Sequence, residues 1–285
     1  MENWWRYCLS LFLMMSCVSC DRLSNETYHH LSENEKRELS SKYTSLAGRI
    51  AQGSPKNIKL LEKAIRLDPR NDAAWVNLGE TYLQRGLYAE WNKYNDKAIQ
   101  LNPKEWQARR GQDKLFFFRD YAGALYDLDI TDTLTVGKTD YIYNTSVDYL
   151  RGLCYYGLKN HDKATEYFNL YLKTENEKTG SKQLDKTAYL YLGMIENYNQ
   201  NYSAAIEILS KGIGEYDHLA DIYYQLALAH FMIGEAEIAD QQINKALTLF
   251  NQKNYHKSQF QLYEVIDQLY LKNIRKLQAE IECFL

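Results

Sequence analysis

Proline, glycine and cysteine are all scarce in this chain. Its 285 residues include 3 prolines, 14 glycines and 5 cysteines. Proline and glycine are the residues that most strongly interrupt helices, so their scarcity favours a mostly helical chain. Only Cys154 and Cys283 lie outside the first twenty residues, and their wide separation predicts neither a disulfide framework nor a metal site.

The chain also lacks a concentration of charge of one sign. Its formal net charge is -3 at pH 7, and its 34 basic and 37 acidic residues are interspersed along the sequence. Nucleic-acid binding depends on a basic patch that neutralises phosphates. We therefore predict no nucleic-acid partner.

A set of catalytic or metal-ligating residues is missing as well. None of the 6 histidines forms a His-Glu-x-x-His pair. Asp127, Asp129 and Asp132 lack the glycine and the distal glutamate of a calcium loop, which indicates a solvated acidic loop. Cys154 lies between Leu153 and Tyr155, so it is predicted to be a small buried hydrophobe. We predict no enzyme activity, no metal and no cofactor.

No apolar run is long enough to span a bilayer. The longest, residues 7–19, has about thirteen residues, whereas a spanning helix needs roughly 20. It ends in Cys17-Val18-Ser19-Cys20-Asp21, which resembles the lipobox of bacterial lipoproteins. Two features depart from that pattern: Cys17 stands where leucine is commoner, and Arg6 is the only base before the apolar run.

The lipobox resemblance implies a specific N-terminal organisation. Residues 1–19 would be the signal peptide, Cys20 the acylated first residue, and residues 20–37 a polar tether. The protein would then be lipid-anchored to the bacterial cell envelope, at an inner or outer membrane that the sequence does not distinguish. The alternative is an uncleaved hydrophobic N-terminus or an ordinary secreted protein.

The sequence repeats itself with a period of 34 residues. The segment 64–69, Ala-Ile-Arg-Leu-Asp-Pro, recurs as 98–103, Ala-Ile-Gln-Leu-Asn-Pro. In three later copies, a small residue precedes a second small residue by 12 positions. This spacing suits two antiparallel helices, which approach each other most closely where small side chains face each other. These pairs are Gly152/Ala164, Gly193/Ala205 and Ala227/Ala239.

This period and these residues resemble the tetratricopeptide repeat. The resemblance implies an all-α, right-handed α-solenoid of about six helix pairs over residues 38–253. Two copies are irregular. Trp91 replaces a small residue in the second, which predicts splayed helices, and Gln112 and Thr131 do not fit the third. The expected copies are 38–71, 72–105, 105–138, 145–178, 186–219 and 220–253.

The pattern changes after the repeats. Within the C-terminal segment 254–285, apolar residues recur every three or four positions over 258–282, which predicts one long amphipathic helix. We expect this helix to cap the last repeat. The alternative is a helix that dimerises or binds a partner.

In tetratricopeptide arrays, particular positions of each first helix face the concave groove. In this chain several of these positions hold aromatic residues with one arginine, a composition that binding hot spots favour. We therefore expect a protein or peptide partner there, unless the C-terminal helix or a long loop fills the groove. The candidate groove residues are Trp106, Arg109, Phe116, Tyr149, Tyr156, Tyr224 and Phe231.

Together these patterns predict a membrane-anchored scaffold or peptide-binding adaptor. The alternative is a structural subunit of an envelope secretion or assembly machine, held by flat surfaces instead of a groove. The 25 tyrosines and the loose lipobox resemble proteins of the Bacteroidota.

Overall fold

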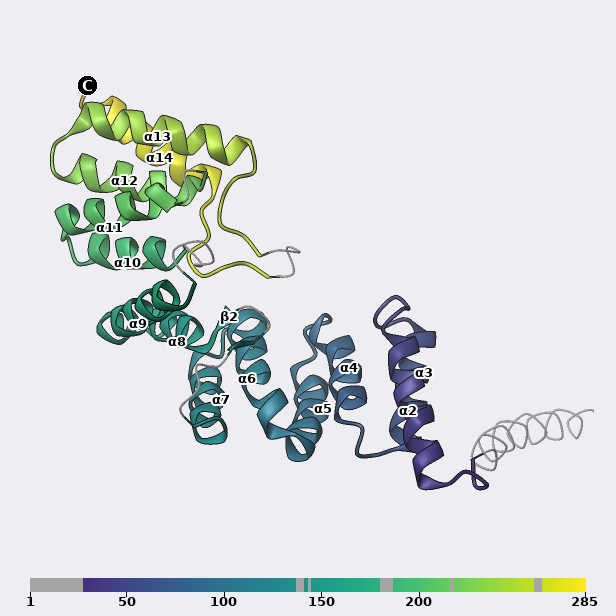
Figure 1. Cartoon of the computed structure of the whole chain (residues 1–285). Coiled ribbons are helices and arrows are strands. Elements are labelled where there is room, and N and C mark those ends of the chain that lie inside the picture. The colour runs from purple at the N-terminus through teal and green to yellow at the C-terminus, as the bar shows by residue number, and fades with distance from the viewer. Residues whose placement is uncertain (1–27, 137–140, 143–144, 180–186, 216–217, 259–262) are drawn as a thin grey trace, which may run out of the picture. The chain divides into compact units, whose positions relative to one another are not determined.

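A computed structural model of the chain describes residues 28–136, 141–142, 145–179, 187–215, 218–258 and 263–285. Within these ranges the structure has thirteen α-helices, α2 to α14 (Figure 1). A short antiparallel hairpin joins β1 (Tyr141–Ile142) to β2 (Thr145–Ser146). The chain divides after Asn102 into two compact units, which we describe in turn.

The first unit contains two antiparallel helix pairs, α2 (Glu33–Ala47) with α3 (Pro55–Leu67) and α4 (Asp72–Leu83) with α5 (Tyr88–Leu101).

Polar residues replace apolar ones in the packing of α2. Its N-terminus is fixed by a capping box, in which the Ser32 hydroxyl accepts from the backbone N–H of Glu35 and the Glu35 side chain accepts in return. Along the helix, Ser40 Oγ donates a 2.8 Å hydrogen bond to the carbonyl of Ala64. Asn71 Nδ2 donates to Ser40 Oγ at 2.8 Å. These bonds join α2 to the following elements where the sequence offers few apolar side chains.

The splaying predicted for α4 and α5 does not occur. Trp91 is fully buried, and a Cβ added at Gly79 would lie 2.9 Å from Asn95 Nδ2 and 3.3 Å from Tyr94 Cβ of α5. Gly79 therefore allows a close helix approach although its partner position carries the largest side chain.

The second unit contains four further helix pairs and a terminal helix. The pairs are α6 (Pro103–Asp113) with α7 (Tyr121–Leu134), α8 (Val147–Gly157) with α9 (His161–Thr179), α10 (Thr187–Tyr198) with α11 (Tyr202–Glu215), and α12 (Ala220–Met232) with α13 (Ala236–Asn251). The described part of the chain thus has six pairs, and the prediction of an all-α tetratricopeptide fold is confirmed.

A π-helical turn explains the irregular third copy. The turn η1 (Lys114–Phe118) follows α6 directly. The glycine that faces α7 is Gly111, whose added Cβ would lie 3.1 Å from the Ala124 carbonyl. These two residues are 13 positions apart instead of 12, because a π-turn accommodates one extra residue.

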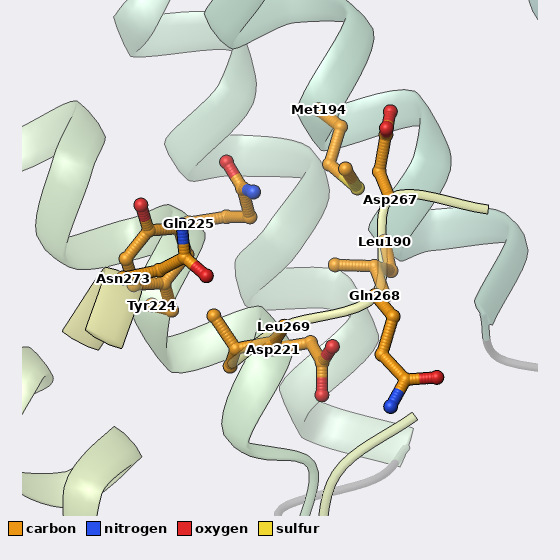
Figure 2. A pocket seen from close by; sticks show the side chains of 9 residues that line it. All are labelled: Leu190, Met194, Asp221, Tyr224, Gln225, Asp267, Gln268, Leu269 and Asn273. Carbon is orange, nitrogen blue, oxygen red and sulfur yellow. The ribbon is translucent and has the colours of Figure 1, made fainter. Parts of the chain in front are cut away.

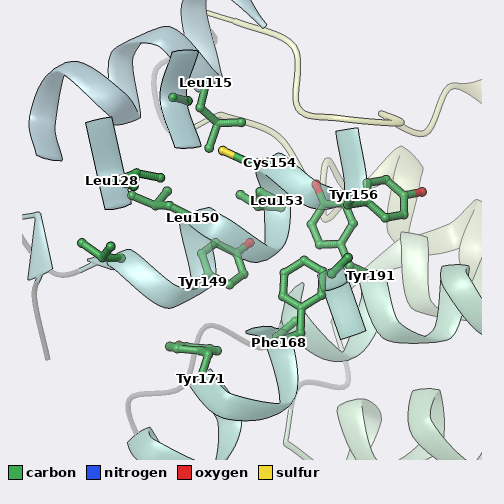
Figure 3. Close-up of a cluster of buried hydrophobic side chains, with 14 of the residues drawn as sticks. Leu115, Leu128, Tyr149, Leu150, Leu153, Cys154, Tyr156, Phe168, Tyr171 and Tyr191 are labelled. Carbon is green, nitrogen blue, oxygen red and sulfur yellow. The ribbon is translucent and has the colours of Figure 1, made fainter. Parts of the chain in front are cut away.

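In the regular pairs the glycine of the first helix allows a close approach, but it faces a large residue one turn beyond the predicted small one. A Cβ on Gly193 would lie 2.4 Å from Leu209 Cγ, and one on Gly152 would lie 2.7 Å from the Phe168 ring. The core of the second unit forms around such contacts between α8, α9 and α10 (Figure 3). In the turn between α12 and α13, Gly234 adopts a φ of 88°, which glycine tolerates without steric cost.

The long C-terminal helix is a wrong prediction. Of the described residues after α13, only α14 (Leu271–Glu282) is helical, and the backbone before it is interrupted by Asp267 with a φ of 53°. Since the apolar residues Val265, Ile266 and Leu269 are buried, they pack against the second unit without continuing the helix. The α14 residues Ile274, Leu277 and Ile281 are buried with residues of α12 and α13.

The helix α14 caps the array, as expected. Its residues Arg275, Lys276 and Glu280 are exposed on the opposite side, and a polar outer face is typical of a terminal cap. Among the described helices, none is both long and apolar enough for a membrane span.

Candidate functional site

The predicted acylation site, Cys20, lies outside the described residues, as do the signal peptide and most of the predicted tether. Lipidation therefore stays a prediction.

Trp106 and Arg109 lie one turn apart on α6. Both are partly buried, and the Arg109 guanidinium carbon lies 5.8 Å from the centroid of the Trp106 ring. This distance is within the range of a cation–π contact. The two residues therefore form one local aromatic and cationic surface.

Tyr149 belongs to the core, which corrects its assignment to an accessible groove. It is 4% exposed, and its ring lies 5.3 Å from Tyr171 and 5.8 Å from Phe168, measured between centroids. Its hydroxyl is hydrogen-bonded to Thr187 Oγ1. Figure 3 shows it among the buried side chains of α8 and α9.

The chain's own C-terminal segment covers several of the other candidate residues. We call the described residues 254–258 and 263–270, between α13 and α14, the C-terminal strap. Figure 1 shows its yellow-green trace leave α13, extend past α12 and return to α14. At its far end Tyr263 stacks on Phe116, with ring centroids 4.8 Å apart and planes 8° from parallel.

The middle of the strap is fixed to α8 and α10. The Tyr156 hydroxyl donates a 2.6 Å hydrogen bond to Asp267 Oδ2, and burial raises the pKa of Tyr156, with a further contribution from this carboxylate. The Tyr191 hydroxyl donates to the Ile266 carbonyl at 3.3 Å. Ile266 itself is buried in the same hydrophobic cluster as these tyrosines.

The start of the strap is attached to the N-terminus of α12. The backbone N–H of His256 donates to Asp221 Oδ2 at 2.7 Å, and that of Ala220 donates to the Asn254 carbonyl at 2.8 Å. Beyond α14, Phe284 contacts Phe231 edge-on, with centroids 5.2 Å apart. Phe116, Tyr156 and Phe231 are thus in contact with the chain's own C-terminal residues.

A pocket remains where the strap crosses α10 and α12 (Figure 2). Its volume is about 230 Å³, and it contains Tyr224, the remaining candidate groove residue. Because Asp267 at its edge is exposed, the pocket is accessible to solvent. Its lining residues are Leu190, Met194, Asp221, Tyr224, Gln225, Asp267, Gln268, Leu269 and Asn273.

The pocket has two carboxylates and no basic side chain in its lining. Asp221 is 5% exposed, and this burial raises its pKa to about 6, although two backbone N–H groups oppose the shift. None of the ion pairs among the described residues includes Asp221. The pocket is therefore a site of uncompensated negative charge.

The sequence pattern missed this pocket as a site. Asp221 lies three residues before Tyr224 on α12, at a position that the repeat register also turns toward the groove, but the candidates were chosen for aromatic side chains. Asp267 has no periodic signal, because it reaches the pocket through the strap.

The three aspartates predicted to form a solvated loop lie on α7 and form ion pairs, although Asp129 and Asp132 stay more than half exposed to solvent. Asp127 is fully buried and pairs with Arg110 at 2.6 Å and with Lys114 at 2.9 Å. Asp129 and Asp132 pair with the buried Arg151. These pairs serve packing between helices, and the described residues contain no cluster of three or more metal-ligating side chains.

Cys154 is buried as expected. It is fully inaccessible in the core, and burial raises the pKa of its thiol. The thiolate is the reactive form of cysteine, so this residue acts as a packing residue.

Comparison with known proteins agrees with this architecture. Residues 60–90 and 149–177 match family models described as tetratricopeptide repeat. Among curated proteins, the BBSome complex member BBS4 of Bos taurus is 23% identical over 195 residues, covering 68% of this chain and 35% of that protein. Tetratricopeptide repeat protein 5 of Bos taurus is 26% identical over 174 residues, covering 55% of this chain and 38% of that protein. The chain thus spans little more than a third of either relative.

Two solved structures have a similar fold. PilW, described as a widely conserved type IV pilus biogenesis factor, superposes with a TM-score of 0.59 at 18% identity, covering 74% of this chain and 94% of PilW. Pseudomonas aeruginosa PilF gives a TM-score of 0.61 at 16% identity, covering 86% of this chain and 99% of PilF. At these identities the likeness concerns the fold alone. The described helices thus have the fold of an all-α array of tetratricopeptide repeats.

Proposed function

We propose that this protein is a lipid-anchored scaffold of the bacterial cell envelope that binds a protein or peptide partner through the open part of its concave face. The observation that carries the binding proposal is the pocket between α10, α12 and the C-terminal strap. It combines apolar walls with several polar groups, as binding sites commonly do.

The anchor in this proposal rests on the Ser19-Cys20 pattern at the end of the apolar run. An acylated Cys20 would hold the array at a membrane surface through the tether 20–37. The array would then present its pocket to partners near that surface.

A second candidate is a structural subunit of an envelope secretion or assembly machine. It is favoured by two observations: the strap occupies much of the predicted groove, and second helices of the pairs expose large apolar side chains. Tyr126 is 65% exposed on α7, Leu170 is 43% exposed on α9, and Ile238 is 38% exposed on α13. Such residues can contact a partner outside the groove. The two pilus proteins share only the fold, so a pilus role is not part of either proposal.

Co-purification of the tagged full chain from its native cells distinguishes the two candidates. One variant combines Met194→Ala with Gln225→Ala in the pocket, and the other combines Tyr126→Ser with Leu170→Ser on the second helices. The proposed function predicts that the pocket variant loses a co-purifying partner and the outer variant keeps it. The opposite result would favour the machine subunit. If both variants kept every co-purifying partner, both candidate functions would be contradicted. Melting curves of each variant control for folding.

A further inference from the structure

The pocket's electrostatics point to a particular kind of group on the partner. Asp221 is a buried carboxylate in its lining, and Asp267 is a second, exposed carboxylate. Burying a charge without a partner is unfavourable, so a cation that enters the pocket would gain the missing pairing. A bound anion would meet two like charges.

The shape and walls of the pocket favour an organic cation over a metal ion. Two carboxylates fall short of the three or more ligating side chains of a metal cluster, and no such cluster occurs in the described residues. Leu190, Met194 and Leu269 provide apolar walls, which suit the methylene stem of a long basic side chain. The Tyr224 ring adds an aromatic face that attracts a cation.

Polar groups around the carboxylates can bind the main chain of the same partner. Asn197 Nδ2 donates to Gln225 Oε1 at 2.9 Å, which fixes the Gln225 amide in the pocket wall and leaves its amino group available as a donor. Gln268 lines the opposite wall from the strap (Figure 2). Donors and acceptors of this kind match peptide groups on either side of an inserted side chain.

We propose that this pocket accepts the lysine or arginine side chain of a peptide segment, with Asp221 pairing its charge and Asp267 adding negative charge at the exposed edge. The inference rests on the proposed function, since it names the residue type by which the partner is recognised. The strap is part of the site, because it supplies Asp267, Gln268 and Leu269.

The test uses a phage library of random dodecapeptides, selected on the immobilised full chain. Enriched peptides are then synthesised with a fluorescent label and titrated against the wild type, Asp221→Asn and the control Asp162→Asn, an exposed aspartate of α9. Each peptide is also made with its basic residue changed to glutamine. Cadaverine serves as a competitor, since it carries the cation without a peptide.

The proposal predicts that enriched peptides share a lysine or arginine. Changing it to glutamine should weaken binding to the wild type and to Asp162→Asn by about tenfold or more, but have little effect on binding to Asp221→Asn. Peptides that bind without such coupling to Asp221 would overturn this inference and leave the scaffold proposal intact. A selection that enriches no peptide would contradict both this inference and the scaffold proposal. Cadaverine binding as tightly as the peptides would overturn the peptide assignment in favour of a small free cation.

Discussion

Tyr156 and Asp267 are 111 positions apart in the sequence, yet the Tyr156 hydroxyl donates a 2.6 Å hydrogen bond to the Asp267 carboxylate. This bond joins the first helix of a repeat pair to the C-terminal strap. Together with the Phe116–Tyr263 stack, it places the chain's own residues where a partner was expected. The surface left for recognition is accordingly a pocket rather than a long aromatic groove.

Tyr149 should contribute to folding and not to recognition. Because it is almost fully buried against Phe168 and Tyr171, Tyr149→Ala should reduce the free energy of unfolding by about 3–5 kcal/mol, as for other large aromatic truncations. Tyr224→Ala, at the partly buried pocket wall, should cost clearly less. Urea unfolding followed by circular dichroism measures both. If both variants lost the same small amount of unfolding free energy, Tyr149 would have to be reassigned to the accessible surface.

The close approach of α10 and α11 depends on Gly193. In Gly193→Ala the new Cβ would lie 2.4 Å from Leu209 Cγ, so overpacking should cost about 1–3 kcal/mol. The control is Gly214→Ala on the same helix pair, where no atom lies within 4 Å of the new Cβ. That change should be neutral or stabilising by about 0.5–1 kcal/mol. Similar thermal unfolding of the two variants would show that the helices can separate freely.

Asp221 should make stability depend on pH. Its pKa rises from 3.8 to about 6 on folding, so the folded state holds its proton more tightly than the unfolded state. The resulting contribution is complete below about pH 4 and is lost as the pH rises through 6.

At pH 8, Asp221→Asn should therefore exceed the wild type in free energy of unfolding by up to about 3 kcal/mol, since its amide oxygen can still accept from His256 N–H. The gain should disappear near pH 4. Urea titrations at pH 4, 6 and 8 measure it, with Asp162→Asn as the control. A variant that is less stable at every pH would show that the carboxylate is needed for folding.

Cys20 should be the site of acylation. In the native cells, Cys20→Ala should accumulate an unprocessed precursor and lose metabolic labelling with palmitate, because the sulfur that accepts the lipid is absent. Cys17→Ala should keep the label. Labelling that persists in Cys20→Ala would refute the lipobox assignment.

Much of the fold could be predicted from the sequence because the repeat fixes local contacts. The 34-residue period and the pairing of Gly193 with Ala205 identify helices whose packing involves near neighbours in sequence. The predicted register of the third pair is off by one residue, because the π-turn at Lys114–Phe118 has no simple sequence signal.

The strap and the pocket were harder to predict. Apolar residues spaced by three or four match one helical stripe, but the same residues can be buried by an extended segment that packs on other helices. Ile266 is buried in this extended way, because Tyr191 and its neighbours offer an apolar surface. Asp267 reaches the pocket only through this long-range contact, so no local pattern identifies it.

The central claim is that the C-terminal strap covers the predicted groove residues Phe116 and Tyr156, and photo-crosslinking tests it most directly. Phe116 would be replaced by p-benzoylphenylalanine in the full chain, which is irradiated in its native cells and analysed by mass spectrometry. The structure predicts an intramolecular crosslink to the peptide that contains Tyr263, because the two rings stack at 4.8 Å. Crosslinks to another protein, with none to the chain's own C-terminal residues, would contradict the account.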